Sequence, residues 1–209
     1  MAYTIFDLEC DGLLDEVTKL HCFCYQIYEK GVLLEKGALV NPNDIITFLD
    51  KQETIVGHNI VKFDLPVLKK LLGWKKPKEL KIIDTMGLSW YLYIGRKSYG
   101  LESFGEEFGV PKPKISDWSN LTIEEYIHRC SEDVEINQRL FHNQIHFLHK
   151  LYPKQEDKER IINYLNFKLD CLREQEEVKI KVDTKLLYKS LDELETTPVS
   201  LMKLKKSKL

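Results

Sequence analysis

The chain has 209 residues, a formal net charge of −2 at pH 7, and 43% hydrophobic and 31% charged residues. This is the composition of a globular protein with a full hydrophobic core. No apolar run reaches the roughly 18 residues of a membrane span, and the N-terminus lacks the basic and apolar regions of a signal peptide. We therefore expect a cytoplasmic protein with no membrane contact.

The predicted elements begin with strands and continue with helices and strands in alternation. The expected strands are 3–9, a hairpin over 20–40 that turns at Gly31, 54–59 and 81–85. The expected helices are 45–52, 64–74, 87–93, 98–110, 121–152 (one helix, or two with a break near 129–131), 154–177 and the end of 178–194; 111–120 is expected to be a loop and 200–209 a frayed basic tail. This order predicts an α/β fold, with helices flanking a central mixed sheet.

Charge and cysteine content leave the partner class open. A net charge of −2 does not exclude nucleic-acid binding, because acids that hold metal ions at a site cancel basic residues elsewhere in the sum. The five cysteines form no CxxC pair, which indicates reduced thiols in a cytosolic protein.

The first strand carries two acids that need an explanation. Asp7 and Glu9 stand two residues apart in FDLEC, so both project from one face of the strand, together with Ile5, while Phe6 and Leu8 project from the other. Two like charges at this spacing repel each other. They are tolerated if cations lie between them or if both are solvated at the end of the strand.

Two further acids follow in later elements. Asp64 closes GHNIVKFD at the start of a predicted helix, where it could act as an N-cap. Asp133 closes HRCSED within the long late helix, where it could be an ordinary surface acid. Each signal is weak alone, but their order along the chain is specific.

The three segments resemble, in this order, the motifs of the DEDD 3′–5′ exonucleases, whose fold is ribonuclease H-like, over roughly residues 3–150. The resemblance implies that Asp7, Glu9 and Asp133 ligate one of two divalent metal ions, Mg²⁺ or Mn²⁺. Asp7 would also bridge to the second ion, with Asp64 assisting through water. Such ions activate a water and stabilise the leaving oxygen of a phosphodiester, and hard oxygen ligands suit them.

A fifth residue distinguishes the branches of this family. One branch has a tyrosine four residues before the last acid, where this chain has Arg129; the other has a histidine five residues before it, where this chain has His128. The resemblance therefore favours His128 as the residue that orients or deprotonates the water, a task suited to a group that titrates near neutral pH. The alternative is a surface histidine, with Tyr126 in a displaced tyrosine role.

Other segments resemble the proofreading domain of family A DNA polymerases of the phage type, which normally carry the tyrosine. These are IDTMGLSWYL, SYGLESFGEEFG and the stretch 172–194, similar to the junction that leads into the polymerase. We therefore divide the chain into an exonuclease domain at 1–153 and a helical extension at 154–209. A separately encoded DNA polymerase would be a partner, and a phage-encoded chain would act in the host cytoplasm.

Candidate substrate contacts follow from composition and from the second motif. Exonucleases of this kind hold a frayed 3′ end by stacking and apolar wedging, and aromatic residues interleaved with basic ones suit strand binding. Core packing remains open for Leu13, backbone hydrogen bonding for Asn59, and a solvated loop for Arg96, Lys97 and Tyr99. The candidates are Leu13, Asn59, Phe63, Arg96, Lys97 and Tyr99.

Three remaining features have ordinary explanations. Asp84 is expected to cap the helix that follows it rather than to bind metal, and His58 is expected to be structural. His142, His146 and His149 have metal-compatible helical spacing, but no nearby acid or cysteine completes a site, so a solvated helix face is favoured.

The sequence thus predicts a metal-dependent 3′–5′ exonuclease that releases mononucleotides from a single-stranded or frayed DNA end, in a proofreading role. One alternative is an RNA-trimming enzyme of the same fold, which only a 2′-hydroxyl contact would distinguish. The other is a catalytically silent module that recruits a polymerase, although such a module has no physical reason to retain mutually repelling acids.

Overall fold

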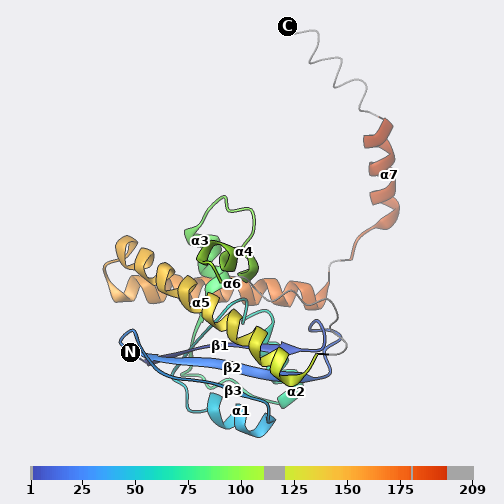
Figure 1. The fold of residues 1–209 in the computed structure, drawn as a ribbon. Helices are drawn as coiled ribbons and strands as arrows, with labels where there is room; N and C mark the ends of the chain where they lie inside the picture. The colour runs from blue at the N-terminus through green and yellow to red at the C-terminus, as the bar shows by residue number, and fades with distance from the viewer. Residues whose placement is uncertain (1, 111–120, 180, 197–209) are drawn as a thin grey trace. The chain divides into compact units, whose positions relative to one another are not determined.

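A five-stranded mixed sheet forms the centre of the protein, shown by a computed structural model that describes residues 2–110, 121–179 and 181–196. Its strand order is β3-β2-β1-β4-β5 (Figure 1). The first three strands pair antiparallel, and β4 and β5 join in parallel with β1. The strands are β1 (Ala2–Cys10), β2 (Leu20–Glu29), β3 (Val32–Leu39), β4 (Thr54–Gly57) and β5 (Lys81–Asp84).

The predicted helices are present, with small changes at their ends. The segment predicted as one helix or two is one unbroken helix, and Thr122 and Glu125 form a capping box at its start. The predicted loop 111–120 and the tail 200–209 lie outside the described residues. The helices are α1 (Pro42–Leu49), α2 (Asp64–Leu72), α3 (Thr85–Leu92), α4 (Leu101–Phe108), α5 (Ile123–Leu151), α6 (Gln155–Val178) and α7 (Thr184–Thr196).

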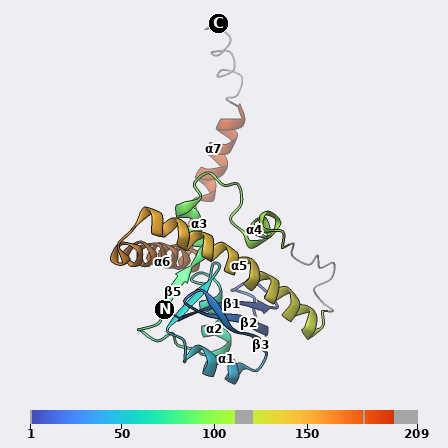
Figure 2. The same cartoon turned by 60° about the vertical axis from the view of Figure 1, so that its left-hand side comes forward.

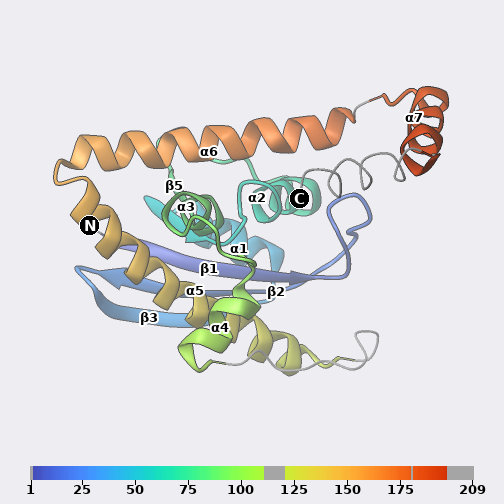
Figure 3. The same ribbon diagram turned by 90° about the horizontal axis from the view of Figure 1, so that it is seen from above.

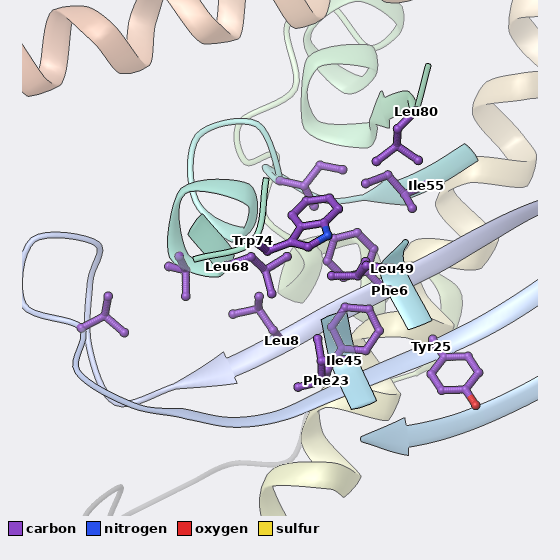
Figure 4. Close-up of a cluster of buried hydrophobic side chains, with 13 residues drawn as sticks. Phe6, Leu8, Phe23, Tyr25, Ile45, Leu49, Ile55, Leu68, Trp74 and Leu80 are labelled. Carbon is purple, nitrogen blue, oxygen red and sulfur yellow. The ribbon is translucent and has the colours of Figure 1, made fainter. Parts of the chain in front are cut away.

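Helices α1 and α2 cover one face of the sheet. The apolar residues of β1 and β2 on this face pack against both helices, and the rings of Phe6 and Phe23 stack with centroids 4.9 Å apart (Figure 4). The buried side chain of Trp74 belongs to this core, and its indole N–H donates a hydrogen bond to Asp50 at 2.9 Å. Phe6 and Leu8 belong to this core, as the alternation of β1 predicts.

The long helix α5 crosses the opposite face, with α3 and α4 beside it (Figures 2 and 3). Here Ile5 of β1 packs among the buried residues of α5, including Val134 and Phe141. Asp7 and Glu9 share this face of β1 with Ile5, so the core that buries Ile5 also sets the direction of the two acids.

The chain divides into two compact units, Met1–Arg173 and Glu174–Leu209. The first contains the whole sheet, so the mixed α/β fold class predicted from sequence is confirmed within it. The division into an exonuclease domain at 1–153 and an extension at 154–209 stays a prediction. None of the described helices is long and apolar enough to cross a membrane.

Candidate active site

Three carboxylates meet where β1 ends beneath α5. Asp7 and Glu9 come from β1, and Asp133 comes from the buried face of α5. Each offers an oxygen, and these oxygens all lie within 4.8 Å of one another. Acids from elements far apart in the sequence are thus brought to one point by the packing of a helix on a sheet.

Asp64 faces the same cluster from α2. It is only 3% exposed, and burial, followed by the charges of Asp84, Glu9 and Asp133, raises its pKa to about 8. It is not the N-cap of α2, because Phe63 holds that position and Asp64 is the first residue of the helix. Asp64 therefore lies close enough to Glu9 and Asp133 for their charges to act on it.

Asp84 shapes the turn that leads to Asp64. Its carboxylate caps α3 by accepting the amides of Met86 and Gly87, and also accepts those of Asn59 and Val61. The predicted capping role is therefore confirmed, and the same side chain ties β5 to the turn after β4. Within that turn Asn59 has φ +64°, a left-handed conformation that asparagine tolerates better than most residues.

The predicted strand-binding run is tied into the fold at several points. Arg96 contacts Glu107 at 2.7 Å and lies over the ring of Phe104. The hydroxyl of Tyr99 donates to a backbone carbonyl, and its own carbonyl accepts from His58, which also bonds Thr85. His58 is thus structural, as predicted. Lys97, by contrast, is exposed.

Arg129 lies against the acidic cluster. Its Nε is 3.1 Å from a Glu9 oxygen, and the two side chains are 17% and 13% exposed. Its positive charge offsets part of the repulsion among the acids, so Arg129 and a metal ion would compete for Glu9.

We expect Arg129→Met to tighten Mn²⁺ binding about fivefold, because a competing ion pair worth ~1 kcal/mol is removed. Calorimetric titration of the two proteins with Mn²⁺ measures this. Arg139→Met is the matched control, since its ion pair with Glu135 lies on the exposed surface of the same helix. Weaker Mn²⁺ binding in Arg129→Met would instead mean that Arg129 holds Glu9 in a ligating position.

The two candidates for the fifth residue occupy different faces of α5. Tyr126 lies seven residues before Asp133, about 20° away around the helix, whereas His128 lies about 140° away. Tyr126 is buried and stacks on His21 with ring centroids 3.9 Å apart. Burial, and then the charge of Glu9, raises the pKa of Tyr126. His128 is exposed, whereas Tyr126 lines a cleft together with Glu9, so the assignment of the fifth position to His128 stays a prediction.

A cleft of about 640 Å³ opens beside Glu9. It contains Leu13 and Phe63, two predicted substrate contacts, and Leu13 is 75% exposed at its edge. His21 also lines it and was missed from sequence. His21 has no pairing partner in β1, because the β1–β2 register shifts at this point: Glu9 pairs with Cys22 and Cys10 with Leu20. No local signal in the sequence marks this bulge. The lining residues are Leu8, Glu9, Cys10, Asp11, Gly12, Leu13, His21, Phe63 and Tyr126.

The three histidines at helical spacing do not gather into a site. Two groups of side chains in the described residues are spaced to hold a metal ion, and neither includes a histidine: Asp7, Glu9 and Asp133, and Cys22, Cys24 and Cys130. His142 is bonded by Tyr3 and Gln138, and the ring of His146 contacts Phe147. The interpretation as an ordinary helix face is therefore favoured over a histidine metal site.

All five cysteines are free thiols. Cys22 and Cys24 of β2 are buried together with Cys130 of α5, and Cys130 Sγ donates to the backbone carbonyl of Asp7 at 3.2 Å. Cys24 and Cys22 lie opposite Asp7 and Glu9 on the neighbouring strand, so these buried thiols pack beside the strand that carries the acids.

Asp64 predicts a pH dependence in the absence of metal. The usual pKa of an aspartate carboxyl is 3.8 and that of Asp64 in the folded protein is about 8, so between these values the folded protein binds more protons than the unfolded chain. Its contribution to stability is full below pH 3.8 and declines as pH rises to about 8. Urea unfolding in EDTA at about pH 5, 6.5 and 8 should show this decline, and it should be smaller in Asp64→Asn. Equal declines in both proteins would contradict the assignment.

No family model matches the chain. Its sequence is 28% identical over 151 residues to the DNA-directed DNA polymerase of Enterobacteria phage T3, and 27% identical to that of Escherichia phage T7. Each alignment covers 58% of this chain, but the chain spans only about a fifth of the length of either polymerase, 21%.

Two solved structures show the same fold. The first is Brucella melitensis NrnC with bound Mg²⁺, at a TM-score of 0.57 and 20% identity, covering 87% of this chain and 90% of that one. The second is the family B DNA polymerase of Pyrobaculum calidifontis, at a TM-score of 0.57 and 14% identity, covering 84% of this chain and 29% of that one. At these identities the likeness concerns the fold, and it agrees with the architecture predicted from sequence.

Proposed function

We propose that the chain, which has the ribonuclease H-like fold of the DEDD-type 3′–5′ exonucleases, is a metal-dependent 3′–5′ exonuclease. The observation that carries the proposal is the meeting of Asp7, Glu9 and Asp133, whose oxygens lie within 4.8 Å of one another. Asp64 faces the same point from a third element. The sequence similarity to two phage DNA polymerases supports the same reaction class.

The donor set fits Mg²⁺ or Mn²⁺. All four side chains offer hard carboxylate oxygens, and their mutual repulsion favours a bound cation. Two such ions, when bound, supply an activated water and a stabilised leaving oxygen. We propose Asp7, Glu9 and Asp133 as direct ligands and Asp64 as the ligand of a bound water. That NrnC was solved with Mg²⁺ supports the metal class.

The cleft beside Glu9 is the proposed place of the terminal nucleotide. Phe63 offers a ring for base stacking and Leu13 an exposed apolar edge for wedging apart the last base pair. Asn59 and Lys97 remain candidates for contacts further along the strand. Arg96 and Tyr99 already serve the loop that contains them, so we propose that they act by shaping it.

The fifth residue is decided by one pair of variants. If His128 orients or deprotonates the water, His128→Ala lowers kcat roughly 10²–10⁴-fold, as loss of a general base does, and Tyr126→Phe has little effect. Single-turnover cleavage of a 5′-labelled oligonucleotide measures both. Tyr126 is buried near Glu9, whereas His128 is exposed. A large loss of kcat in Tyr126→Phe with little effect in His128→Ala would therefore assign the role to Tyr126.

DNA is the proposed substrate, with proofreading beside a separately encoded polymerase as the proposed setting, because the relatives by sequence are DNA polymerases. An RNA-trimming role is the second candidate. It is favoured by the likeness to NrnC. A structure of that protein bound to pGG matches 87% of this chain at a TM-score of 0.58.

A ladder assay tests the proposal. The protein is incubated with 5′-labelled single-stranded DNA and with RNA of matched sequence, in Mg²⁺, Mn²⁺ or EDTA. Metal-dependent shortening of DNA from the 3′ end is expected. Shortening of RNA alone would support the second candidate, and no cleavage by folded protein that is also not stabilised by Mn²⁺ would indicate a silent module.

A further inference from the structure

A second and larger cavity, about 750 Å³, lies away from the carboxylates. Tyr3, Thr54 and Lys81, at the starts of β1, β4 and β5, line it, whereas the acids lie near the end of β1. Tyr3 and Asp7 are four residues apart on one strand, a separation of about 13 Å. Helix α5 and the first turns of α6 complete the cavity, which is thus independent of the proposed active site.

The cavity contains a buried cation that no acid neutralises. Lys158 is only 7% exposed, and within the described part of the chain its ammonium has one hydrogen-bond partner, His149 Nδ1 at 3.0 Å, and no ion pair. The acid lining the cavity, Glu159, is engaged by Lys81 at 3.5 Å and Gln155 at 3.2 Å. Burying an unpaired charge is costly, so an anion beside Lys158 would be strongly favoured.

A buried hydroxyl without a partner marks the same cavity. Thr54 is 2% exposed, and its Oγ1 has no hydrogen-bond partner among the described residues. Most buried polar atoms in proteins are hydrogen-bonded, so an unpaired hydroxyl lining a cavity indicates room for a polar group. The remaining wall is largely apolar: Ile82, Ile83, Phe141, Ile145, Leu148 and Ile162.

From these observations we propose that the cavity binds a small amphipathic anion, a carboxylate or phosphate group on an apolar body. The anionic group contacts the ammonium of Lys158 and the imidazole of His149, whose Nε2 carries a proton when Nδ1 accepts from Lys158. The apolar body packs between Phe141 and Ile145 on one side and Ile83 on the other. The volume lies within the range of small-molecule sites.

Matched eight-carbon probes test the charge requirement. Octanoate, octyl phosphate and 1-octanol are titrated into the full chain and followed by amide chemical shifts. We expect at least one anion to bind about tenfold tighter than 1-octanol, with shifts at Thr54 and Lys158, since a charge-assisted hydrogen bond is worth at least that factor. The stronger anion identifies the head group. Equal binding of anion and alcohol, or shifts confined to exposed lysines, would overturn the proposal.

Two variants separate the site from nonspecific binding. Lys158→Met keeps the apolar stem and removes the charge, so the preference for the anion should be lost, whereas the exposed Lys150→Met should retain it. A preference that survives Lys158→Met would refute the assignment. If that variant does not fold, Ile145→Trp, which fills the cavity, should abolish binding of all three probes, and unchanged binding would equally refute it.

Discussion

Replacing Asp7 with asparagine should lower kcat/KM at least about 10³-fold while the protein stays folded. Asp7 is one of the three acids whose oxygens lie within 4.8 Å of one another, and the metal ions proposed to bind there would supply several kcal/mol of transition-state stabilisation. Because asparagine removes one of three neighbouring negative charges, the melting temperature in EDTA should be unchanged or slightly higher. Cleavage of 5′-labelled DNA and thermal unfolding in EDTA measure the two effects.

The control for this experiment is Asp15→Asn, an exposed acid in the loop after β1. It removes the same charge close in sequence but outside the cluster, so activity should stay within about twofold of the parent. An active Asp7→Asn protein would refute the proposed site, and a collapsed melting temperature would show that Asp7 is needed for folding instead.

Replacing Asp84 with alanine should produce the largest loss of stability, about 3–5 kcal/mol. Four backbone amides lose their common acceptor, and two of them, those of Val61 and Gly87, are in buried bonds. For a domain of this size the melting temperature should fall by roughly 6–20 °C. Activity should fall as well, because the turn that leads to Asp64 loses its anchor.

Asp50→Ala provides the comparison for Asp84. Asp50 is an exposed acid that accepts one hydrogen bond, from Trp74 at 2.9 Å, so its loss should cost no more than about 1.5 kcal/mol. Chemical denaturation of both variants gives the difference directly. Equal losses would mean that Asp84 acts as an ordinary helix cap and does not join β5 to the turn after β4.

The cleft beside Glu9 illustrates why part of the site was inaccessible from sequence. His21 enters it because the β1–β2 pairing shifts by one residue, and a bulge of this kind depends on the partner strand rather than on the residues around His21. Arg129 pairs with Glu9 for a similar reason: only the packing of α5 across the sheet brings the two side chains to 3.1 Å.

The sequence by itself determined the strand and helix order, the faces of β1 and the identity of the four acids. Each of these depends on local periodicity or on motif spacing, which are properties of the chain alone. The choice between His128 and Tyr126 was different. Spacing along the chain favours His128, and the packing of α5 places Tyr126 near Glu9, so the kinetic comparison of the two variants has to assign the fifth residue.

The tertiary structure alone decided what lies around those acids. It placed Asp84 under the turn that leads to Asp64 and Arg129 against Glu9. Away from the acids, it left Lys158 buried without an acid partner in the described residues. Burial and charge compensation are properties of the packed protein, because they depend on side chains that meet only when distant elements dock. A sequence pattern therefore names a candidate residue, and only the packing shows which of its neighbours alter its charge.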